Sequence, residues 1–331
     1  MSFDLITLGR VSMDLFSENI GAPFEQIESF ETGVGGSPTN IAIGSSRLGL
    51  KVAAITAVGE DKTGDFVVDY LQREAVSTDF IPRKAGTRTG MAVVGVQPPA
   101  QFPLVFYRDN ASDIYLTIDD IASAPIAESR ALLLSGTALS RGTCRDATLY
   151  AADIAKNAET TVFIDLDLRP DQWTHPKAYG LNVRAVFAAV DVLIGTEEEF
   201  FAALSPEPES IMQGQAVSDK EALDQLLQNL LTMYPKLTLV VKRGAAGVSI
   251  LAHHQADRDV AGFPVEVLNT VGAGDAFASG LIYGRLQGWN WYKSARLANA
   301  CGALVVTRNG CAKVFPYQEE IQSFIEANGG Y

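Results

Sequence analysis

The sequence predicts an α/β protein whose central sheet is doubly wound, mostly parallel and flanked by helices, with a small β-sheet lid. From residue 131 onward, short apolar strands alternate with helical segments, which is the rhythm of parallel βαβ units. Two strand-like segments, at about 10–35 and 88–115, interrupt this rhythm and predict the lid. Because no linker is rich enough in Pro or Gly to divide the chain, we expect residues 1–331 to form a single domain.

The first third of the chain carries the elements that precede the regular alternation. Leu5–Leu8 is a short apolar strand that stops at Gly9. Ser37 is expected to be the N-cap of a helix with Pro38 in its first position, because a Ser hydroxyl satisfies free amides and Pro lacks an amide hydrogen. The pattern then predicts a strand at 52–58, a helix at 64–73 and lid strands at 91–96 and 104–107.

The remaining elements alternate in type along the chain. Because the carboxyl ends of parallel strands meet at one edge of the sheet, we expect ligands to bind at that edge. The expected strands are 131–134, 161–165, 192–194, 237–241 and 248–251, and the expected helices are 144–156, 177–189, 197–204, 220–234, 273–287, 292–307 and 319–327.

The composition narrows the class of protein. Lys and Arg number 26 against 39 Asp and Glu, a net charge of −13, which argues against nucleic acids and anionic membranes as partners. A hydrophobic content of 47% excludes intrinsic disorder. There is no basic signal-peptide segment, no apolar run near the ~20 residues that span a bilayer, and no C-x-x-C spacing among the cysteines. We therefore expect a cytoplasmic protein with free thiols.

The strongest local signal is residues 269–277, NTVGAGDAF, which lead into an apolar helix. Free amides at a helix N-terminus bind anions, phosphate above all. Asp275 could accept a proton from a hydroxyl while those amides hold the charge of a transferred phosphoryl group. The alternative is a tight turn in which Asp275 only caps the helix, and the motif alone leaves both interpretations open.

Residues 33–40, GVGGSPTN, form a second glycine-rich segment before a helix. Glycine lets a ligand approach the backbone, and the Asn40 amide offers a polyol both a donor and an acceptor. The segment does not directly follow the first strand, and Pro38 occupies the third glycine position of a dinucleotide fingerprint, which disfavours a Rossmann site. The Gly-Lys-Ser/Thr of a Walker A motif is absent from the sequence.

These two motifs, in this order and at this separation, resemble the N-terminal and C-terminal signatures of the ribokinase-like (PfkB) sugar-kinase family. Residues 47–49 and Gly59 extend the N-terminal signature, and the resemblance covers essentially the full length of the chain. It implies a ribokinase-like fold and a kinase that uses ATP and Mg²⁺ to phosphorylate a sugar-like hydroxyl.

The resemblance also implies a role for each matching residue. Thr196 replaces the usual asparagine of an Asn-x-x-Glu motif, and Asn269 stands where many members have an aspartate near a monovalent cation, so a requirement for such a cation stays open. The implied roles are: Asp275 as catalytic base; Gly272, Ala273 and Gly274 as anion hole; Asp14, Gly35, Gly36 and Asn40 at the substrate; Thr196, Lys242, Gly244, Gly247 and Asn299 at the nucleotide; and Glu199 at Mg²⁺.

Two arginines bear on the choice of sugar. Arg108 lies toward the end of the second lid segment, and Arg169 follows a core strand. A guanidinium binds a carboxylate bidentately, which a sugar acid offers and a neutral sugar does not, although either arginine could equally form a structural ion pair. In 2-keto-3-deoxygluconate kinases, arginines at both corresponding places face the acid end of the substrate, so this resemblance favours a sugar acid.

Four segments sharpen the resemblance toward the 5-dehydro-2-deoxygluconokinases of myo-inositol breakdown: 107–113, 135–140, 165–170 and 194–200. This resemblance implies phosphorylation of the C6 hydroxyl of 5-dehydro-2-deoxy-D-gluconate. The nearest alternative is 2-keto-3-deoxygluconate kinase, followed by a fructokinase or ribokinase, and then by a nucleoside kinase or a non-catalytic sugar-binding protein. Family resemblance also favours a homodimer.

Overall fold

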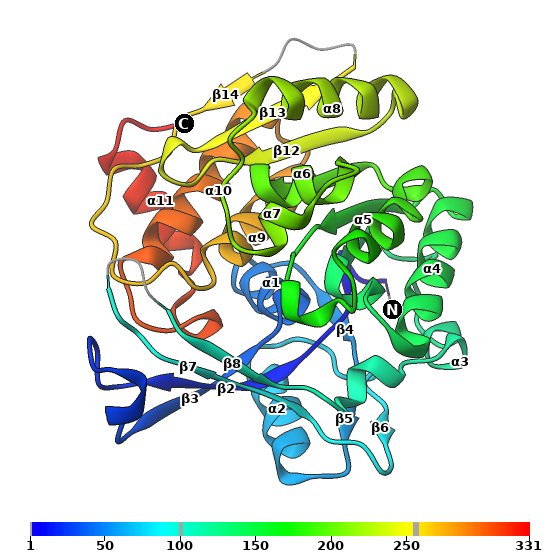
Figure 1. Cartoon of the computed structure of the whole chain (residues 1–331), viewed down its shortest axis with the longest axis vertical. Helices are drawn as coiled ribbons and strands as arrows, with labels where there is room; N and C mark the ends of the chain where they lie inside the picture. The colour runs from blue at the N-terminus through cyan, green and yellow to red at the C-terminus, as the bar shows by residue number, and fades with distance from the viewer. Residues whose placement is uncertain (1, 99–101, 254–257) are drawn as a thin grey trace.

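The larger sheet of the computed structural model, which describes residues 2–98, 102–253 and 258–331, has eight strands in the order β14-β13-β12-β11-β10-β9-β1-β4 (Figure 1). The strands from β12 to β4 run parallel, whereas β13 pairs antiparallel with both of its neighbours, β12 and the edge strand β14. Their bounds are β1 Leu5–Leu8, β4 Val52–Ile55, β9 Ala131–Ser135, β10 Thr161–Asp165, β11 Val192–Thr196, β12 Thr238–Lys242, β13 Val248–Ala252 and β14 Arg258–Val260.

Helices cover both faces of this sheet, which is why the parallel strands are almost continuously apolar. On one face α9 and α10 pack closely, since an added Cβ at Gly280 would lie 2.9 Å from the Ala298 Cα. That face carries α1 Ser37–Arg47, α2 Lys62–Arg73, α9 Ala273–Leu286, α10 Trp291–Val306 and α11 Gln318–Ala327; the other carries α3 Ile118–Ala122, α4 Gly142–Asn157, α5 Pro176–Arg184, α6 Glu197–Leu204, α7 Glu209–Met212 and α8 Lys220–Met233.

The predicted lid is a four-stranded sheet in the order β3-β2-β7-β8, drawn in blue and cyan at the lower left of Figure 1. Its strands are β2 Ser12–Ser17, β3 Phe30–Gly35, β7 Gly90–Val94 and β8 Leu104–Tyr107. Asp14 lies within β2, opposite Gly33 of β3 and Ala92 of β7. The lid therefore carries a buried carboxylate next to the large sheet.

The predicted α/β architecture and lid are confirmed, but three local predictions are wrong. The N-cap of α1 is Gly36, at φ 100°, and not Ser37. A Cβ on Gly36 would lie 2.4 Å from the Arg10 carbonyl oxygen, so the chain enters α1 through a conformation and a contact that require glycine. The strand predicted at 52–58 ends at Ile55, and the Val58 amide donates to the Pro82 carbonyl oxygen outside the large sheet. The helix predicted at 177–189 ends at Arg184, and a short 3₁₀ turn, Phe187–Ala189, follows it.

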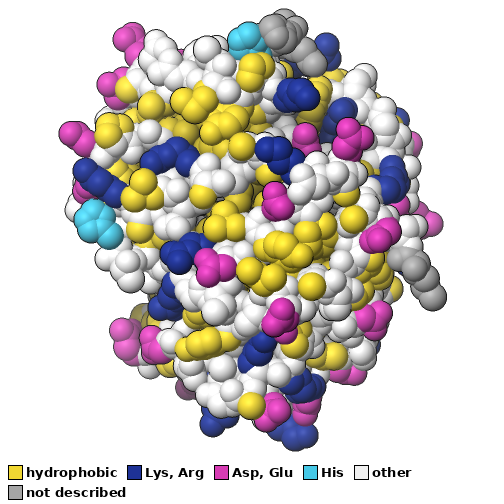
Figure 2. Space-filling model, turned by 90° about the vertical axis from the view of Figure 1, so that its right-hand side faces the viewer, with side chains coloured by type: hydrophobic (Ala, Val, Ile, Leu, Met, Phe, Trp, Pro, Cys, Tyr) yellow, Lys and Arg dark blue, Asp and Glu magenta, His cyan; other side chains and the backbone are white. Residues whose placement is uncertain are grey.

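The surface carries charged side chains of both signs. On the face in Figure 2, lysine and arginine side chains are interspersed with acidic ones and do not gather in one patch. Within the three described ranges, no helix combines the length and apolar character needed to cross a bilayer.

Candidate active site

The predicted site residues gather at the carboxyl edge of the large sheet. The strand order changes direction around β1, which has β4 on one side and β9 on the other, and such switch points open a crevice for ligands. Arg10 follows β1, Asp167 follows β10, and Thr196 and Lys242 end β11 and β12. The lid strand β2 begins at Ser12, directly after Arg10, so it lies at the same edge.

The predicted anion hole is the first turn of α9. Its N-cap, Gly272, has φ 84°, and a Cβ there would lie 2.6 Å from the Cys311 Sγ, so both conformation and space require glycine. The Ala273 amide donates to the Thr270 carbonyl oxygen at 3.3 Å. Among the described residues, the amides of Gly274 and Asp275 have no acceptor, and they lie where the helix dipole favours an anion.

Asp275 and Asn40 join the two sequence motifs. The Asn40 Nδ2 donates to the Asp275 Oδ2 at 2.7 Å, across a separation of 235 residues. Burial raises the pKa of Asp275, the negative charge of Asp167 raises it further, and the bond from Asn40 opposes both. The carboxyl group is thereby held in one orientation with a proton affinity suited to a general base.

Asp14 provides a second buried carboxylate at the site. Its Oδ1 accepts a hydrogen bond from the Ser12 hydroxyl at 2.6 Å. A Cβ on Gly35 would lie 1.9 Å from the Asp14 Oδ2, so the carboxylate rests directly on the glycine backbone. Burial raises the pKa of Asp14 to about 6, although the Ser12 bond and Arg10 act in the opposite direction. Such a group can accept hydrogen bonds from sugar hydroxyls.

Three guanidinium groups lie near these carboxylates. Arg108 is buried and pairs with Asp113 at 2.7 Å, and it also donates to the Gln172 side chain at 3.4 Å. Arg169 is 36% exposed and pairs with the Asp167 Oδ1 at 3.0 Å. The third, Arg10, lies 3.5 Å from the Asp167 Oδ2 and was not singled out by the sequence.

Asp167 organises this cluster. Its backbone has φ 36°, an unusual conformation for a residue other than glycine, and strain of this kind occurs at functional sites. Its Oδ2 also accepts hydrogen bonds from the Ser135 and Thr137 hydroxyls, at 3.0 and 2.9 Å. Burial opposes ionisation, but Arg169 and Arg10 hold the pKa of Asp167 below its usual value, so the side chain is an anion.

Lys242 brings a positive charge beside the anion hole. Its Nζ lies 3.2 Å from the Asp165 Oδ1 and 3.7 Å from the Glu199 Oε2, and a Cβ added to Gly274 would lie 3.4 Å from the same nitrogen. The sequence associates Lys242 with the nucleotide loop, whereas Asp165 enters only as the first residue of the segment 165–170. Its contact with Lys242 depends on the carboxyl ends of β10 and β12 lying close together. Burial raises the pKa of Asp165, which Lys242 opposes.

Glu199 and Thr196 form a capping box at the start of α6. The Glu199 Oε2 accepts from the Thr196 amide at 2.7 Å, and its Oε1 accepts from the Leu168 amide at 3.0 Å. The carboxylate thus ties the loop after β10 to α6. In the described part of the chain, no group of three or more His, Cys, Asp or Glu side chains is placed to hold a metal. A single carboxylate such as Glu199 fits a Mg²⁺ ion, because Mg²⁺ in nucleotide sites is usually bound by one or two carboxylates together with waters and phosphates.

The predicted nucleotide residues lie beyond Lys242. Gly247 has φ 98°, and a Cβ there would lie 2.1 Å from the Val260 carbonyl oxygen, so β14 approaches this loop closely. Gly244, at φ 55°, has open space around it. The Asn299 Nδ2 donates to the carbonyl oxygens of Val260 and Ala261, at 2.9 and 3.0 Å. Asn299 therefore holds α10 against the strand that borders the loop.

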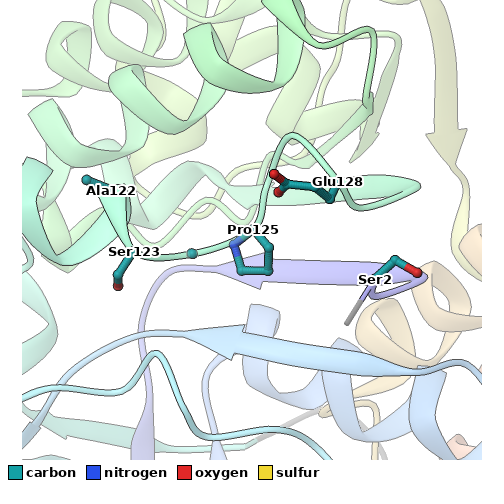
Figure 3. Close-up of a pocket in the computed structure, with 6 residues that line it drawn as sticks. Ser2, Ala122, Ser123, Pro125 and Glu128 are labelled. Atoms are coloured by element: carbon teal, nitrogen blue, oxygen red, sulfur yellow. The ribbon is translucent and has the colours of Figure 1, made fainter.

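Two surface hollows differ in their relation to this site. A cavity of about 330 Å³ is lined in part by Leu168, Thr196 and Glu199, so it borders the carboxyl edge. A larger hollow of about 580 Å³, shown in Figure 3, lies near the amino ends of β1 and β9, between Ser2 and Glu128. It lies at the opposite edge of the sheet from the residues described above.

Curated relatives of this chain are sugar-acid kinases by name. A protein from Bacillus anthracis named 5-dehydro-2-deoxygluconokinase is 33% identical over 325 residues, covering 98% of this chain and 95% of the relative. One of the same name from Clostridium tetani is 32% identical over 324 residues, covering 98% and 93%.

Solved structures extend the likeness to the fold. A fructokinase double mutant from Vibrio cholerae, in a fructose, ADP and potassium ion bound form, is 26% identical with a TM-score of 0.81, covering 98% of both chains. A sugar kinase from Pyrococcus horikoshii in complex with ATP is 25% identical with a TM-score of 0.79, covering 98% of this chain and 99% of that one. The model of the pfkB family carbohydrate kinases matches residues 3–317. The chain therefore belongs to the pfkB family of carbohydrate kinases, phosphotransferases with an alcohol group as acceptor.

Proposed function

We propose that this kinase uses ATP to phosphorylate the C6 hydroxyl of 5-dehydro-2-deoxy-D-gluconate, a sugar acid of myo-inositol catabolism. The observation that carries the proposal is the group of guanidiniums at the pocket of Asp14 and Asp275. Arg169 is partly exposed, and buried Arg108 lies close enough to Asp14 to lower the pKa of that carboxyl. Positive charge of this kind suits a carboxylate and is of no use to a neutral sugar. The names of the curated relatives support the same substrate.

In the proposed mechanism, residues of the lid and the start of α1 bind the sugar, and the first turn of α9 provides the base and the anion hole. Asp14, with the backbone of Gly35 and Gly36, binds the hydroxyls of the sugar and directs the C6 hydroxyl at Asp275. As the bond from the C6 oxygen to the γ-phosphorus forms, Asp275 takes the proton and the bond to ADP breaks. The free amides at the start of α9 hold the charge on the phosphoryl oxygens. Closure of the lid would exclude water and so limit hydrolysis of ATP.

The nucleotide would lie along the carboxyl ends of β11 and β12. Lys242 would approach its phosphates, Gly244 and Gly247 would let it pass close to the backbone, and Asn299 would border the adenine. Thr196 and Glu199 would face its phosphates and Mg²⁺. When bound, Mg²⁺ neutralises charge on the phosphates. The ATP complex of the Pyrococcus horikoshii kinase supports ATP as the donor.

Release of ADP from ATP and Mg²⁺ tests this proposal, with 5-dehydro-2-deoxygluconate run beside 2-keto-3-deoxygluconate, fructose, ribose and adenosine. We expect kcat/KM for the first acid to exceed the others by at least about 100-fold, which is 2.7 kcal/mol of discrimination. A preference for 2-keto-3-deoxygluconate would keep the arginines and the mechanism but change the substrate. A preference for a neutral sugar or adenosine would contradict the proposed role of the guanidiniums.

We also propose that two copies of the chain associate through the lid. Leu104, Val105 and Tyr107 of the edge strand β8 are exposed, Tyr107 by 62%. An exposed apolar edge strand is normally covered by another chain. Light scattering should give twice the 35.5 kDa of one chain, and Val105→Asp should reduce it to the monomer mass. A monomeric wild-type protein would overturn this proposal.

A further inference from the structure

We infer that the Arg10 guanidinium hydrogen-bonds the carboxylate of the substrate, which makes Arg10 the residue that selects a sugar acid over a neutral sugar. This inference rests on the proposed function, and it assigns the acid-binding role to a side chain other than Arg108 and Arg169. Among the described residues, the Arg108 and Arg169 guanidiniums donate hydrogen bonds, whereas that of Arg10 does not.

Arg10 is a buried cation without a hydrogen-bond partner. Its side chain is 6% exposed, and its Nε is buried and makes no hydrogen bond. Within the described residues, none of its nitrogens donates to any acceptor, and its single ion-pair contact is the 3.5 Å approach of Nε to the Asp167 Oδ2. A guanidinium carries five N–H donors, and burying them unpaired costs free energy. The site therefore lacks an acceptor at this position.

Among the described residues, the nearest carboxylates form their close contacts with groups other than Arg10. Asp113 is committed to Arg108 at 2.7 Å, and the Asp167 Oδ1 lies 3.0 Å from Arg169. The Asp167 Oδ2 already accepts hydrogen bonds from two hydroxyls, those of Ser135 and Thr137. Arg10 and Arg169 thus face the same carboxylate, Asp167, and Arg10 makes no hydrogen bond to it. A carboxylate brought by the substrate would supply the acceptor that the Arg10 guanidinium lacks.

The position of Arg10 matches this role. It follows β1 at the switch point of the large sheet and directly precedes β2, which carries Asp14. Its guanidinium carbon lies 5.3 Å from the centre of the Phe106 ring of β8, so one face of the planar group is covered by the lid. The N–H edges remain for a ligand, and their fork geometry fits a carboxylate bidentately.

The test compares 5-dehydro-2-deoxygluconate with its primary amide, which has nearly the same shape but no charge. The wild-type enzyme should prefer the acid by about 100-fold in kcat/KM. Arg10→Gln should reduce this preference to less than about 3-fold by raising KM for the acid, with KM for ATP unchanged. Arg10→Lys should keep an intermediate preference for the acid, because lysine retains the positive charge but not the forked geometry of the guanidinium. If Arg10→Gln does not fold, Arg10→Lys provides the test in its place. Arg145→Gln, at an exposed arginine on α4, is the matched control.

Each remaining outcome is decisive. If Arg10→Gln slows the acid and the amide equally, or neither, the inference is overturned while the proposed function stands. If Arg108→Gln removes the preference and Arg10→Gln does not, Arg108 is the carboxylate ligand and the inference is again wrong. If the wild-type enzyme turns over neither sugar acid in the substrate panel, the proposed function fails first, and the assignment of Arg10 fails with it.

Discussion

Asp275→Asn should lower kcat by about 10²–10⁴-fold, the usual contribution of a general base. The substitution keeps the shape of the side chain, and an amide oxygen can still accept the hydrogen bond from Asn40, so the start of α9 should stay in place. Affinity for ATP should change little, because the free amides of that turn belong to the backbone. Steady-state assays of ADP release with both substrates varied would measure the two effects separately.

The pH dependence of activity and stability provides a second test of the role of Asp275. Because burial and Asp167 raise the pKa of Asp275, wild-type kcat/KM should fall with decreasing pH earlier than an ordinary aspartate would predict. A carboxyl group whose pKa is raised in the folded protein stabilises the fold below its unfolded-state pKa, and this contribution is lost as pH rises through the folded-state pKa. At neutral pH Asp275→Asn should therefore be at least as stable as the wild type, so low activity cannot come from unfolding.

Asp224→Asn, at an exposed aspartate on α8, is the matched control and should change neither kcat nor stability. If Asp275→Asn keeps near-full kcat, Asp275 is not the base. If it loses activity together with ATP affinity, its effect lies in the anion hole and not in proton transfer.

Lys242→Met should destabilise the protein by about 3–5 kcal/mol, the cost of removing one partner from a buried ion pair. The Lys242 side chain is 13% exposed and that of Asp165 is 3% exposed, so little water is available to replace the ammonium group. Glu199 would lose the same neighbour. Urea unfolding followed by circular dichroism would measure the change in the free energy of unfolding.

The size of this loss should depend on pH. Lys242 lowers the pKa of Asp165 against the effect of burial, and without it that pKa would rise further. A group with a raised pKa in the folded protein loses its stabilising contribution as pH rises, so the difference from wild type should widen as pH rises above about 7, where Asp165 ionises in the wild type but not yet in the variant. Adding Asp165→Asn should recover part of the loss, because it removes the unpaired charge.

Lys220→Met gives a matched control. Lys220 pairs with Glu197 at the surface, where its side chain is 56% exposed, and such pairs contribute less than about 1 kcal/mol. Equal losses for Lys220→Met and Lys242→Met would show that the buried network at β10 and β12 does not stabilise this edge of the sheet.

Much of the architecture follows from local patterns. Apolar runs of strand length and their alternation with helices are enough to predict β1, β10 and α6 at their observed bounds. The two glycine-rich motifs lie 235 residues apart, and the bond from Asn40 to Asp275 shows that they meet in the folded chain. Ser37 shows the limit of this reasoning, because the backbone of Arg10 and not the capping preference of serine decides where α1 begins.

The three arginines differ in how far the sequence alone can single them out. Arg108 and Arg169 stand out in the sequence because each follows a predicted strand. Arg10 lies between β1 and β2 with no motif of its own, and its importance depends on Asp167 being shared with Arg169 and saturated by two hydroxyls. That arrangement involves four separate segments of the chain, so no local pattern contains it.

The bond between Asn40 and Asp275 has a consequence for synthesis of the chain. At about 5–20 residues per second, a ribosome needs roughly 12–47 s to add the 235 residues that separate the two. Pairing of strand β1 is also delayed, because β1 has a neighbour on both sides only after β9 has been synthesised. A chain interrupted before α9 therefore carries Asp14 but neither the proposed base nor the proposed anion hole, and under the proposed mechanism it would not consume ATP at this site.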